Sequence, residues 1–118
     1  MQPELNPGEY VFCTVKDPGG IPTGEILSLF REKEGLTLIL EKSRADELGL
    51  AYTFVASWIS LTVHSSLDAV GLTAAFSQAL AQENISCNVI AGYYHDHIFL
   101  APESAHRAME ILKNFSGE

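Results

Sequence analysis

The sequence predicts an α+β fold, a small two-layer sandwich with helices on one face of an antiparallel sheet. Two observations carry this prediction. Apolar, β-rich runs dominate the first half with one short helix among them, whereas strands alternate with two helices in the second half. Hydrophobic residues also make up 47% of the 118 residues, which is enough apolar material to offset the chain entropy lost on folding.

The first half of the chain is predicted to form three strands and a short helix. Three runs rich in apolar and β-branched residues predict the strands: Glu9 to Val15, Glu25 to Arg31 and Leu36 to Glu41. Ser43 and Asp46 have the Ser-x-x-Asp spacing of a capping box, which predicts the start of a helix. Gly49 is placed to end that helix.

The second half is predicted to alternate strands with helices. The predicted strands are Tyr52 to Val63, broken near Ala56 and Ser57, then Ile85 to Ala91 and His97 to Ala101. A second Ser-x-x-Asp box, at Ser65 and Asp68, predicts a helix from Asp68 to about Glu83, which Asn84 ends. Pro102 suits the first turn of a terminal helix.

The charge of the chain argues against several classes of partner. Fifteen Asp and Glu residues against seven Lys and Arg give a net charge of -8, which repels phosphate backbones and anionic lipids. The longest apolar stretches are far shorter than the roughly 20 residues of a membrane helix, and the N-terminus lacks the pattern of a signal peptide. We therefore expect a cytoplasmic protein that binds neither nucleic acid nor membranes.

Few residues offer catalytic or metal chemistry. His95 and His97 would point to the same side of a strand, but two imidazoles alone do not define a metal site. Cys13 and Cys87 lie in apolar runs and are expected to be small buried side chains. With no Ser-His-Asp set, phosphate loop or carboxylate pair in the sequence, we expect no enzyme activity, no metal and no cofactor.

The second half resembles a known family. The run SLDAVGLTAAFSQALAQENISCNVIA, followed by YYHDHIFLAPESAHRAMEILKNF, resembles an ACT domain, the ligand-sensing module of aspartokinases and other amino-acid-regulated enzymes. The likeness is strong over about residues 58 to 115 and is greatest to small stand-alone proteins with two tandem modules. It implies a ferredoxin-like sandwich of strand–helix–strand–strand–helix–strand type. The expected modules are a reduced one at residues 1–57 and a fuller one at residues 58–118.

The resemblance, together with the chemistry of the loop, implies a ligand site in the second module. Backbone N–H groups at a helix start suit a carboxylate, and the side chains of Asp68 and Asn88 could accept hydrogen bonds from an ammonium. Gly71 would allow a close approach, although it could equally serve packing alone, with Ser65 and Asp68 acting only as caps. The predicted ligand-binding residues are Ser65, Ser66, Leu67, Asp68, Ala69, Val70, Gly71, Asn88, Val89 and Ile90.

Two functions of different classes remain open. The first is a non-catalytic regulatory protein that binds an amino acid or a similar small metabolite. The second is a structural interaction module that binds no metabolite, and a metal-dependent enzyme centred on His95 and His97 is a weaker third alternative. The mean hydropathy of +0.11 in so small a chain also predicts a homodimer or a higher even-numbered homo-oligomer.

Overall fold

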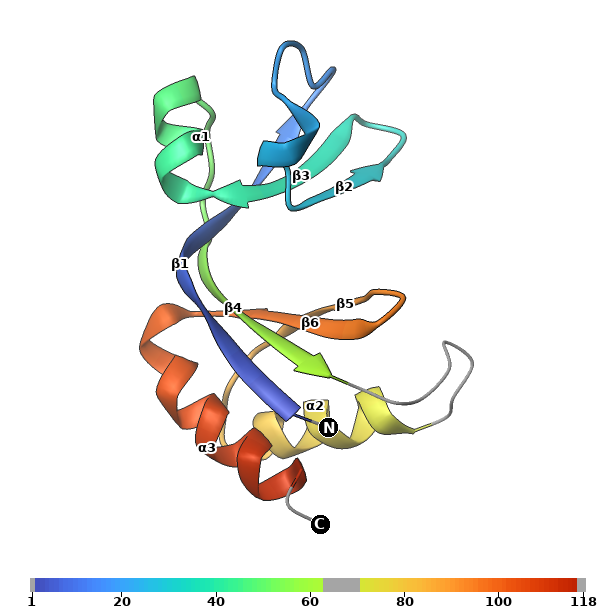
Figure 1. Ribbon diagram of the computed structural model, residues 1–118, viewed down its shortest axis with the longest axis vertical. Helices are drawn as coiled ribbons and strands as arrows, with labels where there is room; N and C mark the ends of the chain where they lie inside the picture. Colours follow the sequence, from blue (N-terminus) through green and yellow to red (C-terminus); the bar gives the residue numbers. More distant parts are fainter. Residues whose placement is uncertain (1, 63–70, 117–118) are drawn as a thin grey trace. The chain divides into compact units, whose positions relative to one another are not determined.

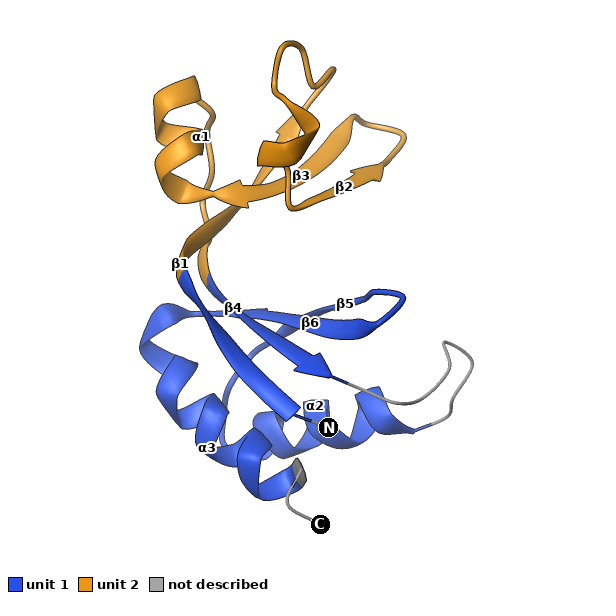
Figure 2. Cartoon of the chain, viewed as in Figure 1, with its two compact units in different colours: residues 1–7, 57–118 blue, residues 8–56 orange. Residues whose placement is uncertain are grey.

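The computed structural model describes residues 2–62 and 71–116, which fall into two compact units. We call Gly8–Ala56 the first unit (orange, unit 2 in the key of Figure 2), and the described parts of residues 1–7 and 57–118 the second unit (blue, unit 1 in that key). Both units pair antiparallel strands and pack helix against sheet (Figure 1). The predicted α+β class with antiparallel sheets is therefore confirmed.

The first unit joins three strands in the order β2-β3-β1. These are β1 (Gln2–Val15), β2 (Ser28–Arg31) and β3 (Leu36–Glu41), with a 3-10 turn at Thr23–Glu25 and the helix α1 (Lys42–Leu48) after β3. Alternate residues of β1 and β3 point to one face because side chains alternate along a strand. They form a core closed by α1: Val11, Cys13, Leu36, Leu38, Leu40 and Ala45.

The second unit joins the start of β1 to three further strands in the order β1-β4-β6-β5. The strands are β4 (Val55–Thr62), β5 (Asn88–Ala91) and β6 (His95–Leu100). The helices are α2 (Leu72–Gln82) and α3 (Ala105–Ser116), the latter preceded by a 3-10 turn at Pro102–Ser104. The core between helices and sheet consists of Ile59, Leu61, Phe76, Leu80, Ile85, Ile98, Leu100, Ala105, Ala108 and Leu112.

Several element boundaries differ from the sequence-based predictions. β1 begins at Gln2 rather than at Glu9. Its first residues were not predicted as strand because they include Pro3 and Pro7, and proline usually argues against a strand. α1 begins at Lys42, so that Ser43 lies inside the helix and is not its N-cap. Gly49, in contrast, ends α1 as predicted, with a left-handed φ of 70°.

In the second half, the predicted helix ends agree with the structure, whereas the predictions for β4 and β6 need correction. The break predicted near Ala56 and Ser57 is wrong, since β4 runs unbroken through both residues. β6 begins at His95, two residues before the predicted start. Asn84 has the left-handed φ of 61° expected of a helix terminator, and Pro102 opens the turn before α3. Among the described residues, no helix has the length and apolar character needed to cross a membrane.

Candidate functional site

The predicted ligand site is only partly within the described residues. Ser65, Ser66, Leu67, Asp68, Ala69 and Val70 lie outside them. Gly71 immediately precedes α2, and Asn88, Val89 and Ile90 lie on β5, which pairs with β6. The proposed grouping of the loop with β5 therefore stays a prediction.

Gly71 occupies a position different from the one expected. A helix from Asp68 would place Gly71 inside its first two turns, but α2 begins at Leu72 and Gly71 is its N-cap, with a left-handed φ of 98°. A Cβ atom added at Gly71 would meet no heavy atom of the other described residues within 4 Å. The glycine is thus explained by its backbone conformation, which L-residues rarely adopt.

Asn88 places an amide side chain on β5. Its Nδ2 donates to the main-chain oxygen of Phe99, its cross-strand partner, at 3.4 Å. This bond uses the donor end of the amide, so the group of Asn88 that would meet a ligand ammonium is its side-chain oxygen. Asn88 is exposed, whereas Val89 and Ile90 are half-buried.

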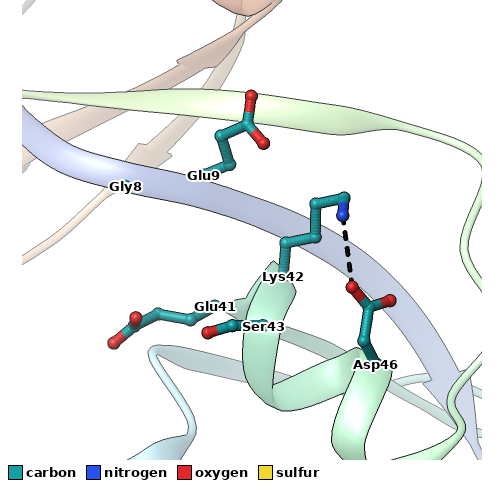
Figure 3. A pocket seen from close by; sticks show the side chains of 6 residues that line it. All are labelled: Gly8, Glu9, Glu41, Lys42, Ser43 and Asp46. Carbon is teal, nitrogen blue, oxygen red and sulfur yellow. Dashed lines mark hydrogen bonds and ion pairs between the residues drawn. The ribbon is translucent and has the colours of Figure 1, made fainter.

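The first unit has a surface depression that the sequence analysis did not identify. It has a volume of about 390 Å³ and lies between β1 and the start of α1 (Figure 3). Its lining residues are Gly8, Glu9, Glu41, Lys42, Ser43 and Asp46. The antiparallel pairing of Tyr10 with Glu41 brings the two segments together, and this register is the signal that sequence reading missed.

An ion pair occupies one side of this depression. Lys42 Nζ lies 3.1 Å from Asp46 Oδ2, and the hydroxyl of Tyr52 donates to Asp46 Oδ1 at 2.6 Å. The Tyr52 hydrogen bond, followed by the one from Lys42, lowers the pKa of Asp46 below its usual value. Three carboxylates against one ammonium leave the lining with a net negative charge, which suits a cationic group better than an anion.

The second unit carries a polar hydrogen-bonded cluster on the sheet face that points away from α2 and α3. Trp58 Nε1 donates to His97 Nδ1 at 3.0 Å, and Asn6 Nδ2 donates to Ser60 Oγ at 3.0 Å. His95 and His97 have ring centroids 6.1 Å apart. Within the described ranges, no group of three or more His, Cys, Asp and Glu side chains is arranged to hold a metal ion.

Each of the two units packs helix against an antiparallel sheet, which is the arrangement of a small α+β module. The ACT domain matches the chain twice, over residues 1–57 and over residues 53–114. The chain therefore belongs to the ACT domain family, and the resemblance seen in the sequence is confirmed for both halves. Among curated proteins, none matches the sequence significantly.

Solved structures show the same arrangement over nearly the whole chain. A Vibrio cholerae protein of unknown function, described as a possible transport protein, is 54% identical to this chain, with a TM-score of 0.86. The match covers 94% of this chain and 86% of the Vibrio cholerae chain. The regulatory subunit of aspartate kinase from Thermus flavus is 9% identical with a TM-score of 0.64, covering 97% and 96%. Aspartate kinase of Clostridium acetobutylicum is 10% identical with a TM-score of 0.64, covering 95% of this chain and 33% of that one.

Proposed function

We propose that this chain is a small, non-catalytic regulatory protein of the cytoplasm that binds an amino acid or a similar small metabolite. One observation carries the proposal. The chain matches the fold of the Thermus flavus regulatory subunit over 96% of that chain. In the Clostridium acetobutylicum aspartate kinase, the matching part is 33% of that chain. The length of the present chain thus corresponds to a regulatory part, and ACT domains are of the ligand-binding type.

The proposed ligand site is the segment Ser65 to Gly71 together with Asn88 to Ile90. Two described features support it. The residue before α2 is a glycine at which an added Cβ atom would meet no other described residue within 4 Å, and α2 of 11 residues offers main-chain N–H groups at its N-terminus. These N–H groups would bind the carboxylate of an amino acid. Val89 packs against the core under α2, so by alternation the Asn88 side chain lies on the opposite face of the sheet, and Asp68 or the main chain of β5 would hold the ammonium.

The experiment is a thermal-shift screen of the purified protein against the twenty amino acids and the common nucleobases. A ligand at 100 times its dissociation constant stabilises the native state by about 2.7 kcal/mol, which is readily detected. Gly71→Ala should abolish the shift produced by the ligand found. Gly49→Ala is the matched control, since Gly49 also has a positive φ and open space around it.

The two glycine variants separate the possible results. A shift lost in Gly71→Ala and kept in Gly49→Ala supports the proposed site. Equal shifts in both variants would place the site elsewhere, and the depression lined by Glu9, Lys42 and Asp46 would be examined next. If no compound of the screen shifts the melting temperature, the regulatory ligand-binding function is rejected.

Exposed apolar side chains favour the second candidate function, assembly with another protein chain. Phe30 on β2 is 71% exposed, and Tyr93 and Tyr94 in the turn between β5 and β6 are 81% and 73% exposed. β2 and β5 are also the terminal strands of the sheet order, and terminal strands tend to pair with other chains. We propose that the protein forms a homo-oligomer, which light scattering at tens of micromolar protein would test. A monomer would contradict it.

A further inference from the structure

The sheet face of the second unit that points away from α2 and α3 carries a histidine whose neutral tautomer is fixed by its neighbour. Ile59, Leu61 and Ile98 point into the core under α2 and α3. Because side chains alternate along a strand, Trp58 and Ser60 of β4 and His97 of β6 point to the opposite face. Ser60 lies directly across from His97 in the antiparallel pairing, and Trp58 is two residues along β4, across from Phe99.

The hydrogen bond between Trp58 and His97 has only one possible direction. An indole N–H is a donor and never an acceptor, so the bond of 3.0 Å from Trp58 Nε1 requires a lone pair on His97 Nδ1. The proton of the neutral ring is then on Nε2. Gly92 gives this edge of the ring its room, since a Cβ atom at Gly92 would come within 3.2 Å of His97 Nε2.

Ser60 is placed to accept a hydrogen bond from His97 when the ring is protonated. Protonation puts an N–H on Nδ1 that faces the N–H of Trp58, and two donors cannot share a hydrogen bond. Ser60 Oγ lies 3.4 Å from the same Nδ1 and can accept its hydrogen. Asn6 Nδ2, which donates to Ser60 Oγ at 3.0 Å and to the main-chain oxygen of Trp58 at 3.3 Å, links the change to β1.

We propose that Trp58, Ser60 and His97 form a proton-operated switch on this face, in which His97 Nδ1 accepts from Trp58 when neutral and donates to Ser60 when protonated. Uptake of one proton changes the charge of the face by +1 and breaks the hydrogen bond from Trp58 Nε1 to His97 Nδ1. No further reactant is involved. This inference is independent of the proposed amino-acid ligand.

The surroundings of His97 set the direction of its titration. Burial, followed by the charge of His95, lowers the pKa of His97, while Asp96 opposes the shift. On the same face, the titratable groups of the described elements are His95 on β6 and, by alternation from Asn6, Glu4 on β1. Asp96 is the next residue of β6 and points to the opposite face. The neighbouring strands β4 and β5 contribute Trp58, Ser60, Asn88 and Ile90, which do not titrate. His64 lies outside the described residues.

Trp58 is the single tryptophan of the chain, so the tryptophan emission, excited selectively over the four tyrosines, comes from this cluster. The emission of the full chain, followed from about pH 8 to pH 4, should show a one-proton transition with its midpoint below the ordinary histidine value of about 6.5. His97→Gln should abolish the transition, because the glutamine oxygen can accept from the indole without titrating. Far-UV circular dichroism at each pH separates the switch from unfolding.

Three further variants keep the proposal falsifiable if His97→Gln fails to fold. His95→Gln should raise the midpoint because it removes a repelling charge, and Ser60→Ala should lower it because the protonated form loses its acceptor. His106→Gln, on the exposed surface of α3, should leave the midpoint unchanged. A transition that persists in His97→Gln, an unshifted midpoint in both His95→Gln and Ser60→Ala, or a flat wild-type emission would overturn the proposal.

Discussion

The two units belong to one family but differ in the depth of their helical layer. In the first unit, α1 spans seven residues and contributes Ala45 to the buried core. In the second unit, α2 and α3 span 11 and 12 residues, and α2 alone contributes Phe76 and Leu80. The second unit therefore has a thicker core and a longer helix with main-chain donors at its start. Both halves match the ACT domain, yet the first unit has a 3-10 turn at Thr23–Glu25 where the second has α2, so family membership does not by itself fix where a ligand can bind.

The largest expected effect tests the difference between the two cores. Phe76→Ala, which empties a fully buried site under α2, should lower the free energy of unfolding by about 3–5 kcal/mol. Leu38→Ala is the matched change in the first unit and should cost about 2–5 kcal/mol. Urea denaturation of both variants measures the two costs. If Leu38→Ala proved the more damaging change, the first unit would be the better packed of the two.

The next effect concerns the two Ser-x-x-Asp segments, which have the same spacing in the two halves. Asp68→Asn should weaken an ammonium-bearing ligand by about 1.5–3 kcal/mol, or roughly 10- to 150-fold, which is typical of a lost charge-assisted hydrogen bond. Asp46→Asn, at the same position of the Ser-x-x-Asp spacing in the first half, should leave the affinity unchanged. Isothermal titration calorimetry with the ligand from the screen measures both. The opposite pattern would move the ligand site to the depression of the first unit.

Much of the fold could be predicted because hydrophobic periodicity and turn residues are local signals. The alternating core residues of β3 and the left-handed positions of Gly49 and Asn84 could all be read from short windows. The start of β1 could not. Its residues 2–7 contain two prolines, and they become a strand only because β4, some fifty residues away, supplies hydrogen-bonding partners.

The site was harder to predict than the fold because it depends on contacts between distant segments. Capping patterns identified Ser43 as an N-cap, whereas the N-cap of α1 is Glu41, two residues earlier. The hydrogen bond from Trp58 to His97 joins residues 39 positions apart and follows from the pairing of β4 with β6. Sequence reading placed both side chains on strands but had no register with which to bring them together.

A smaller effect compares the two glycines that flank helices, Gly71 before α2 and Gly49 after α1. Both have a left-handed φ, and a Cβ atom at either position would meet no other described residue within 4 Å. The cost of Gly71→Ala and of Gly49→Ala is therefore backbone strain alone, about 1–2 kcal/mol for each. Thermal or urea unfolding without ligand measures it. A cost at Gly71 well above that at Gly49 would mean that the loop before α2 contributes packing as well as space.

The smallest effect concerns the pKa of Asp46, the carboxylate of the Ser-x-x-Asp segment in the first half. In the folded protein the Tyr52 hydroxyl and then Lys42 lower the pKa of Asp46. A lowered carboxyl pKa stabilises the fold at pH values above the ordinary aspartate pKa of about 3.9, and this stabilisation is lost as the pH falls through the folded pKa.

Tyr52→Phe removes the larger cause and should raise the pKa of Asp46 toward its ordinary value. Carbon-detected NMR titration of the Asp46 carboxyl measures the shift directly, with Tyr93→Phe, at an exposed turn of the second unit, as the control. Because Asp46 is exposed, the change in stability should be slight and confined to acidic pH, and an unchanged Asp46 titration in Tyr52→Phe would show that Lys42 alone sets it.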